Sequence, residues 1–275
     1  MQIEFTKMHG LGNDFIVINA MQHPFILSAE QIKFMADRHF GIGYDQLLVV
    51  EPASLSDADF RYRIFNADGG EVEQCGNGAR CFALYVHAKG LTKKTTIPVE
   101  TSAGIIELAI ENGQVTVNMG APEFEPDGIP FEANTRADRY AISINGDSVD
   151  IGAVSIGNPH AVIEVVNTDH AHIDTLGPEI ETHSRFPNHA NVGFMQIIDR
   201  QHIRLRVWER GAGETLACGT GACAAMVIGR RQGLLDENVK VDLHGGQLMV
   251  SWADEGTPVF MTGPATFVYE GKITL

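Results

Sequence analysis

The sequence predicts an α/β (α+β) fold of two pseudo-symmetric units, each a curved, mostly antiparallel sheet or barrel around a central helix. Three observations lead to this prediction. The second half of the chain repeats the first, strand patterns flank one helical pattern in each half, and both helical patterns are apolar on nearly every face. A helix of that kind is typical of an element enclosed by a sheet rather than one lying on a surface.

The repeat is clearest in two stretches that align without a gap. Residues 60–75 read FRYRIFNADGGEVEQC, and residues 203–218 read IRLRVWERGAGETLAC. The offset is the 143 positions that separate Cys75 from Cys218, and further upstream it becomes 145 because a loop between positions 46 and 61 differs by two residues. A register kept over this length indicates an internal duplication of a unit of about 140 residues.

The duplication also predicts the domain organisation. We expect one unit to comprise residues 1–120 with 264–275, and the other residues 121–263. The segment after Gly120 must cross to the second unit, so by symmetry the segment after Gly263 crosses back. The active site is then expected in the cleft between the two units.

Short segments with alternating or continuous apolar residues predict the strands. In the first unit they cover 3–8, 15–19, 47–51, 61–66, 96–101, 105–110 and 114–119, and in the second 153–156, 161–165, 192–198, 202–209, 239–244, 247–252 and 258–261. Helices are predicted at about 77–89 and 220–232. Each has a cation in its last turn and is followed by a glycine, Gly90 or Gly233, which suits the negative end of the helix dipole and a left-handed cap.

Composition limits the class of protein. The chain has 275 residues, of which 44% are hydrophobic and 20% charged, as in globular proteins with a substantial core. Its formal net charge of −15 disfavours nucleic-acid partners and anionic membranes. No signal-peptide pattern or membrane-length apolar run is present, and because only four cysteines occur in a chain of this length we expect a reducing compartment.

Two cysteines open similar glycine-rich cassettes, CGNGA at 75–79 and CGTGA at 218–222, each at the start of a predicted helix. A helix N-terminus stabilises a thiolate, so a lowered pKa is expected for both cysteines. The glycines allow close approach of a ligand, and the free N–H groups form a site for a carboxylate. One sulfur removing an α-proton while the other delivers a proton to the opposite face is the chemistry of a cofactor-free racemase or epimerase.

The cysteines also admit other interpretations. Cys81 and Cys223 are interpreted as small buried hydrophobes. The spacings Cys-x5-Cys and Cys-x4-Cys fit no common zinc motif and the cassettes contain no His, so no metal is expected. A disulfide between Cys75 and Cys218 stays open, although the reducing context argues against it. A binding module does not need two activated thiols, and a thiol redox enzyme is disfavoured because no Cys-x-x-Cys is present.

Six motifs together resemble the diaminopimelate epimerase family. They are KMHGLGNDF at 7–15, FNADG at 65–69, QCGNGARC at 74–81, GNPH at 157–160, WERG at 208–211 and ACGTG at 217–221. The similarity runs the whole length, with no departure at a motif position. It implies an enzyme independent of pyridoxal phosphate and of any other cofactor that interconverts LL- and meso-diaminopimelate at one α-carbon. It also implies a role in lysine and peptidoglycan precursor synthesis, a cytoplasmic location and a homodimer. The alternative within isomerases is another amino-acid racemase of the proline-racemase type.

The resemblance also implies roles for individual residues. Cys75 is the proton donor and Cys218 the proton acceptor for one direction, and His160 and Glu209 support them. The implied substrate-binding residues are Asn13, Gln46, Asn66, Gly76, Asn77, Asn158, Asn191, Glu209, Arg210, Gly219 and Thr220.

Arg210 is the only cation in that substrate-binding set, so we expect it to bind the carboxylate at the distal end of the substrate. Its counterpart in the repeat is Ala67, which breaks the symmetry at this position. Taken singly, Asn13 or Asn66 could instead cap a turn, and Arg210 could be a solvated surface charge.

Overall fold

The chain folds into two compact units, Met1–Asn118 with Thr262–Leu275, and Met119–Met261. The computed structural model describes residues 1–72 and 75–275. The motif residue Gln74 lies outside the described residues.

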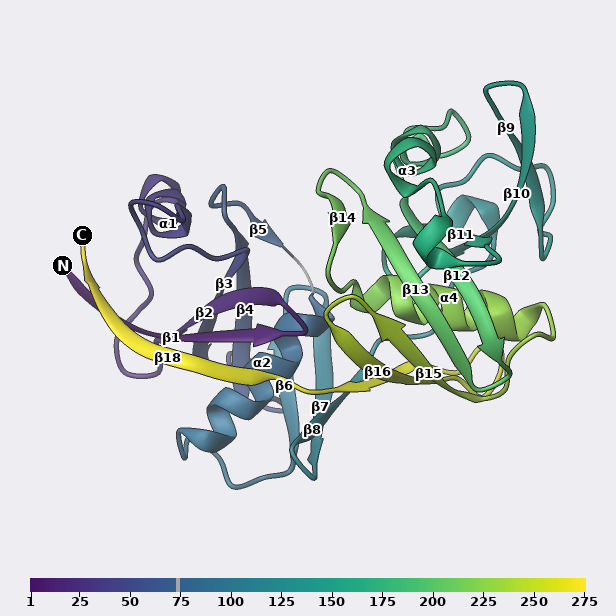
Figure 1. The fold of residues 1–275 in the computed structure, drawn as a ribbon. Helices are drawn as coiled ribbons and strands as arrows, with labels where there is room; N and C mark the ends of the chain where they lie inside the picture. The colour runs from purple at the N-terminus through teal and green to yellow at the C-terminus, as the bar shows by residue number, and fades with distance from the viewer. Residues whose placement is uncertain (73–74) are drawn as a thin grey trace. The chain divides into compact units, whose positions relative to one another are not determined.

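The first unit contains a sheet in which the strands from the two ends of the chain lie side by side (Figure 1). Its strands are β1 (Gln2–Gly10), β2 (Asn13–Asn19), β3 (Gln46–Pro52), β4 (Phe60–Asn66), β5 (Glu71–Val72), β6 (Thr96–Thr101), β7 (Gly104–Glu111), β8 (Gln114–Asn118) and β18 (Thr266–Thr274). Strand β18 pairs antiparallel with β1 from Gln2 opposite Thr274 to His9 opposite Thr266. The β2–β3 and β4–β6 pairs are parallel, and the other pairs within this unit are antiparallel.

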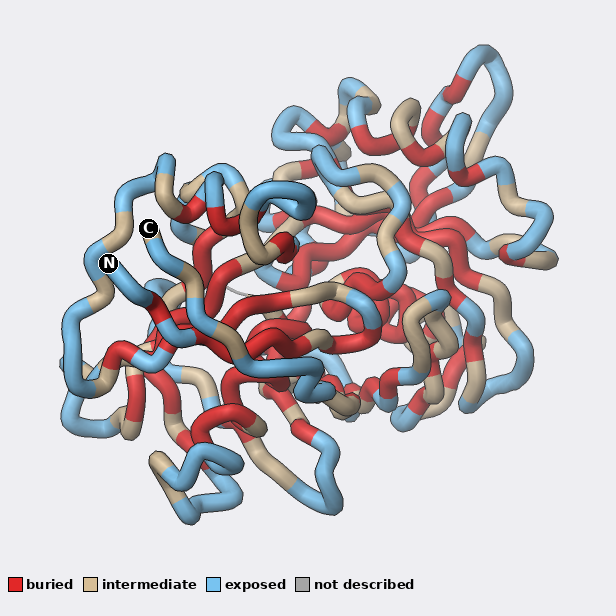
Figure 2. Tube along the Cα trace, turned by 60° about the vertical axis from the view of Figure 1, so that its left-hand side comes forward, coloured by how far each residue is buried: buried red, intermediate tan, exposed pale blue. Residues whose placement is uncertain are grey.

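Helices cover both faces of this sheet. Helix α2 (Gly76–Ala88) packs against β1, β2, β3, β7 and β8, and ten of its 13 residues are buried, as expected for an enclosed helix. Helix α1 (Ala29–Ala36) begins with a capping box at Ser28 and packs Ile32 and Met35 on the opposite face, with Ile16 and Leu47. The buried residues follow the central strands and α2, whereas the connecting loops are exposed (Figure 2).

The second unit repeats this organisation. Its strands are β9 (Tyr140–Ile144), β10 (Asp147–Ser155), β11 (Pro159–Glu164), β12 (Asn191–Asp199), β13 (His202–Glu209), β14 (Gly213–Thr215), β15 (Asn238–Leu243) and β16 (Gly246–Ser251), and β17 (Phe260–Gly263) spans the boundary between the units. Helix α4 (Gly219–Arg231) packs against β10 to β13, β15 and β16, and ten of its 13 residues are again buried. Helix α3 (Ile173–Glu181) packs against β12, β13, β14 and β9, and two 3-10 turns lie at Pro126–Gly128 and Thr168–His170.

The strand registers of the two units correspond residue by residue, at the offsets found in the sequence. In the first unit Phe15 lies opposite Gln46 and Leu47 opposite Phe65; in the second His160 lies opposite Asn191 and Val192 opposite Trp208. The mixed α/β fold class is therefore confirmed, and both central helices lie one residue earlier than predicted.

Several elements were not predicted, and local chemistry explains them. Strand β10 begins at Asp147 rather than position 153, and β9 precedes it through the turn Asn145-Gly146, where both residues have positive φ. Asn-Gly is a strong hairpin signal, and it explains why a strand pair forms in a segment without a predicted strand. Helix α1 has only eight residues, and α3 contains Pro178, so neither gives a long helical pattern.

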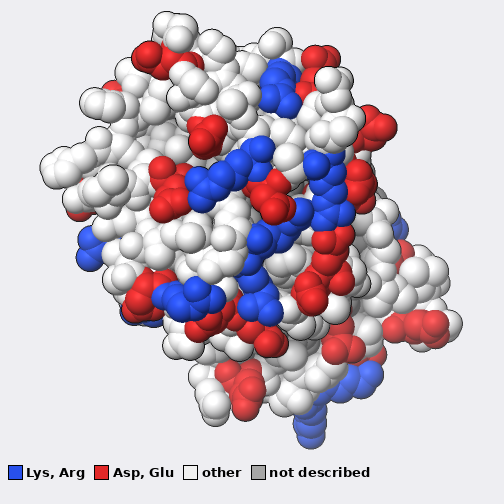
Figure 3. All heavy atoms as spheres, turned by 90° about the vertical axis from the view of Figure 1, so that its right-hand side faces the viewer, with Lys and Arg blue, Asp and Glu red and all other residues white. Residues whose placement is uncertain are grey.

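Surface charge is mixed rather than uniform. On the face drawn in Figure 3, Lys and Arg side chains lie beside Asp and Glu side chains. Ion pairs of the second unit include Arg206 with Glu214 at 2.6 Å and Arg231 with Asp138. Within the described residues, no helix has both the length and the apolar character needed to cross a bilayer.

Candidate active site

Cys75 is the N-cap residue of α2. Its backbone is extended, with φ −145° and ψ 111°, and its sulfur accepts a hydrogen bond from the N–H of Gly78 at 3.4 Å. Gly78 itself has no room for a side chain, because a Cβ there would lie 2.3 Å from the hydroxyl oxygen of Tyr62. The first turn of α2 thus packs tightly against β4, which fixes the position of the Cys75 backbone.

Two asparagines lie beside Cys75. The Sγ atom lies 3.9 Å from Oδ1 of Asn13, and the same oxygen accepts a hydrogen bond from Nδ2 of Asn77 at 3.2 Å. Asn77 is buried in the first turn of α2, and Asn13 begins β2. The structure therefore brings Asn13 and Asn77 of the predicted site together with Cys75.

Gln46 and Asn66 form a second polar pair in this unit. They lie opposite each other on β3 and β4, and Nε2 of Gln46 donates to Oδ1 of Asn66 at 2.9 Å. The other amide atom, Oε1 of Gln46, is buried and has no partner among the described residues. A buried amide oxygen without a hydrogen-bond donor in the protein can accept a hydrogen bond from an N–H group of a ligand.

Cys218 is the N-cap residue of α4 and is more deeply buried than Cys75. Its sulfur accepts from the N–H of Gly221 at 3.4 Å and lies 3.6 Å from Oγ1 of Thr220. Burial raises the pKa of the Cys218 thiol well above its usual range, and the nearby Glu209 carboxylate adds to that rise. The prediction of a lowered pKa was therefore wrong for Cys218, because loss of water outweighs the hydrogen bonds from Thr220 and Gly221.

Glu209 and Arg210 lie where β13 ends, and neighbouring groups hold both. Oε1 of Glu209 accepts a hydrogen bond from the hydroxyl of Thr215 on β14. The Arg210 guanidinium donates to the carbonyl oxygen of Asn188 at 3.0 Å, and its backbone N–H donates to Oδ1 of Asn191 at 3.0 Å. Nδ2 of Asn191 also donates to the carbonyl of Pro159 at 3.2 Å, so both ends of the Asn191 amide form hydrogen bonds with backbone groups.

His160 and Asn158 form the polar pair of the second unit. Nε2 of His160 lies 2.9 Å from Oδ1 of Asn158. Burial lowers the pKa of His160 to about 3, and the positive charge of Arg210 contributes, so the ring is neutral near pH 7. Because an amide oxygen only accepts, Nε2 carries the ring proton, and Nδ1 is buried without a partner among the described residues. His160 therefore fixes the Asn158 amide and does not act as a cationic acid.

Two acidic residues that support the site were missed. Glu181, at the end of α3, accepts from the N–H of Gly211 at 2.8 Å and from Nε1 of Trp208 at 2.7 Å, and so it holds the turn that carries Arg210. Asp45, just before β3, accepts from Nδ2 of Asn13 at 2.9 Å. Asp45 adjoins the predicted Gln46, but no sequence pattern marks Glu181.

Within residues 1–72 and 75–275, no group of three or more His, Cys, Asp or Glu side chains is arranged to hold a metal ion. None of the four cysteines, all of which lie in the described part of the chain, forms a disulfide.

Sequence comparisons with known proteins agree on one family. The sequence model described as diaminopimelate epimerase matches residues 5–125 and 152–268. Proteins named diaminopimelate epimerase from Nitrosomonas eutropha and Thioalkalivibrio sulfidiphilus are 61% and 60% identical, and each alignment covers 100% of both chains.

Solved structures share the fold at low identity. A phenazine biosynthesis protein of the PhzF family from Bacillus anthracis superposes with a TM-score of 0.72 at 19% identity, covering 100% of both chains. A hydroxyproline epimerase from Agrobacterium vitis superposes with a TM-score of 0.71 at 16% identity, covering 99% of this chain and 92% of the other.

Proposed function

The chain belongs to the diaminopimelate epimerase family, and from this premise we propose that it interconverts LL- and meso-diaminopimelate by moving the proton of one α-carbon. The observation that carries the proposal is the equivalent placement of two cysteines. Cys75 and Cys218 are the N-cap residues of corresponding helices, and each sulfur accepts the N–H three residues later at 3.4 Å.

In the proposed reaction the two sulfurs act on opposite faces of the α-carbon. In one direction the Cys218 thiolate takes the α-proton and the Cys75 thiol delivers a proton to the other face, inverting the centre. In the reverse direction the roles exchange. The backbone N–H groups of Gly76-Asn77 and Gly219-Thr220 hold the α-carboxylate and stabilise the negative charge that develops on it.

The raised pKa of Cys218 bears on how the base is made. A buried thiol next to Glu209 stays protonated until a positive charge arrives. The α-ammonium group of a bound substrate supplies such a charge, so substrate binding itself favours the thiolate at Cys218. The base would then form only when a substrate is present.

Recognition of the distal end of the substrate falls to Arg210 and to asparagine amides. Arg210 supplies the charge for the distal carboxylate, and Asn66, Asn158 and Asn191 belong to the same proposed binding set. Asn158 is held through its oxygen by His160, so its Nδ2 group is directed to donate. Arg210 corresponds to the uncharged Ala67 in the first half, and this asymmetry of charge distinguishes the reacting end of the substrate from the distal end.

The family resemblance extends the proposal to assembly and place in metabolism. We propose a cytoplasmic homodimer that works without a cofactor in lysine and peptidoglycan precursor synthesis. The exposed apolar side chains Phe267, Val268 and Tyr269 on β18 support self-association. Sedimentation analysis at several concentrations tests the dimer.

The function is tested by incubating the purified chain with LL-diaminopimelate without any added cofactor and following meso-diaminopimelate by chiral chromatography. We expect equilibration of the two isomers and no turnover of L-proline or trans-4-hydroxy-L-proline in parallel reactions. Turnover of a proline substrate with diaminopimelate untouched would support the racemase alternative instead.

A further inference from the structure

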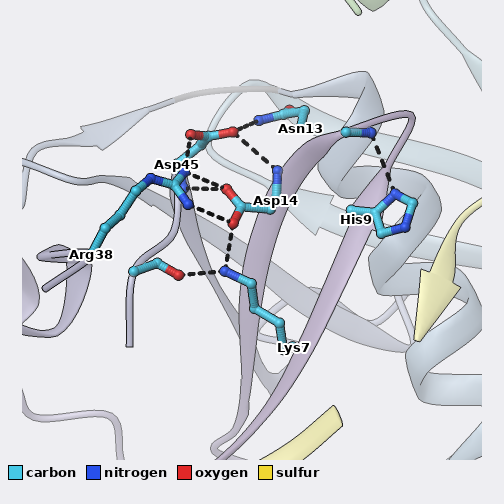
Figure 4. A network of polar contacts seen from close by, with 8 residues as sticks. Lys7, His9, Asn13, Asp14, Arg38 and Asp45 are labelled. Atoms are coloured by element: carbon cyan, nitrogen blue, oxygen red, sulfur yellow. Dashed lines mark hydrogen bonds and ion pairs between the residues drawn. The ribbon is translucent and has the colours of Figure 1, made fainter. Parts of the chain in front are cut away.

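A network of charged side chains holds the NH₂ end of the Asn13 amide (Figure 4), whereas the oxygen of that amide lies near the Cys75 sulfur. Nδ2 of Asn13 donates to Oδ2 of Asp45 at 2.9 Å, and the backbone N–H of Asp14 donates to the same oxygen at 3.0 Å. These contacts join the start of β2 to the residue that precedes β3.

Arg38 and Lys7 fix Asp45 and its neighbour Asp14 in place. One nitrogen of Arg38 donates to Oδ1 of Asp45 at 2.7 Å and to Oδ1 of Asp14 at 2.8 Å. Lys7 donates to Oδ2 of Asp14 at 2.5 Å and also to the carbonyl of Gly43. Although burial opposes ionisation, the hydrogen bonds from Arg38 and Lys7 keep the pKa of Asp14 well below its usual range. The network is therefore charged and well connected.

The chemistry of the two partners sets the orientation of the Asn13 amide. An ionised carboxylate only accepts hydrogen bonds, so Asp45 can face only the NH₂ end of Asn13. The oxygen of Asn13 must then point the other way, where it accepts from Nδ2 of Asn77 and lies 3.9 Å from the Cys75 sulfur. An amide oxygen can accept from a thiol but offers nothing to a thiolate.

The second unit holds its corresponding amide in the opposite sense. Asn158, the repeat counterpart of Asn13, is held through its oxygen by His160. At the offset of 145, Asp14 corresponds to Pro159 and Asp45 to Ala190, neither of which has a carboxylate. The charged network is thus a feature of the first unit that the duplication did not preserve.

We propose that Asp45 is a positioning residue that locks the Asn13 amide with its oxygen toward Cys75 and thereby favours the protonated sulfur. This proposal deepens the proposed function and rests on its assignment of Cys75 as the proton donor. Without Asp45 the amide can rotate and present Nδ2 to the sulfur, which stabilises the thiolate.

The test is a double-mutant cycle in a Cys218→Ala background. The quantity measured is the pH dependence of Cys75 alkylation by iodoacetamide in the absence of substrate. The variants are Asp45→Ala, Asn13→Ala and the two combined. Cys81 and Cys223 are fully buried, and mass spectrometry of the peptide that contains Cys75 separates its signal. Among the described residues, the titratable and charged groups near Cys75 include Tyr62 on β4 and Arg80 and Cys81 on α2, and they are unchanged in every variant.

We expect Asp45→Ala to move the alkylation midpoint to lower pH by about 0.5 to 1 unit when Asn13 is present, the size of one weak hydrogen bond to a charged sulfur. In the Asn13→Ala background the same substitution leaves the midpoint unchanged. An equal shift in both backgrounds would mean that Asp45 acts by its charge alone, and no shift in either would mean that it does not act on Cys75. Both results would overturn the proposal.

Further variants serve as controls for the effects of a lost charge and of misfolding. Asp59→Asn removes a carboxylate that pairs with Lys94 elsewhere in the first unit, and it should leave the midpoint where it is. If Asp45→Ala does not fold, the cycle is run with Asp45→Ser, whose side chain is one bond shorter than that of aspartate. Because the measurement needs no substrate, a chain that alkylates as expected but does not epimerise refutes only the proposed function.

Discussion

Gly78→Ala is expected to disturb the start of α2, the point at which Cys75 is held. A Cβ at this position would lie 2.3 Å from the Tyr62 hydroxyl oxygen and 3.1 Å from Cδ2 of Leu48. Both neighbours are buried, with Tyr62 2% exposed and Leu48 0%, so displacing either side chain costs free energy of folding. Overpacking of this severity costs about 3 kcal/mol, and the better helix propensity of alanine returns about 1 kcal/mol. The net loss is therefore about 2 kcal/mol.

The assay is thermal unfolding followed by circular dichroism, with epimerase turnover measured on the same samples. A loss of about 2 kcal/mol corresponds to a fall in Tm of about 4–8 °C for a chain in this size range. Turnover should fall more than stability suggests, because a displaced first turn also moves the Gly78 N–H that bonds the Cys75 sulfur.

Tyr62→Phe supplies the matched rescue. The Tyr62 hydroxyl is buried and has no partner among the described residues, so its removal alone should be nearly neutral for stability. When Tyr62→Phe is added to Gly78→Ala, more than half of the decrease in Tm caused by Gly78→Ala should be recovered, because the colliding oxygen is gone. If the two substitutions simply add, the collision with Tyr62 is not the reason that position 78 is glycine.

Three further predictions concern the chemistry and recognition. Cys75→Ala or Cys218→Ala should each lower kcat at least about 100-fold with unchanged far-ultraviolet circular dichroism, and substantial turnover in either variant would contradict the two-sulfur scheme. Glu209→Gln in a Cys75→Ala background should shift the thiolate absorbance transition of Cys218 to lower pH, because it removes a negative charge that raises this pKa; a shift to higher pH or none would contradict the assigned cause. Arg210→Lys should raise KM at least about 10-fold with a smaller change in kcat, since a point charge replaces a bidentate fork, and unchanged kinetics would remove Arg210 from substrate binding.

The parts of the fold that follow from local patterns were predictable from the sequence. The repeat register holds in the strand pairing, and the cassettes at 75–79 and 218–222 do start the two central helices, with each cysteine as the N-cap. The glycines that follow both helices have positive φ, 69° at Gly90 and 73° at Gly233, as the capping signal required.

The parts that depend on tertiary burial could not be predicted. The pKa of Cys218 rises because the whole unit excludes water from it, whereas the sequence reveals only the helix N-terminus that acts in the opposite direction. Asp45 and Asn13 are 32 positions apart and belong to no common motif, so their hydrogen bond has no sequence signal. Glu181 reaches Gly211 across 30 positions for the same reason.

The central claim, that two sulfurs act on opposite faces of one carbon, is tested most directly by single-turnover epimerisation of LL-diaminopimelate in deuterated water. The account predicts one deuterium at the inverted α-carbon of the meso product and none in recovered substrate, because different groups remove and deliver the proton. Deuterium entering recovered substrate as fast as product would indicate a single base, and a product without solvent deuterium would indicate direct return of the original proton. Either result would contradict the account.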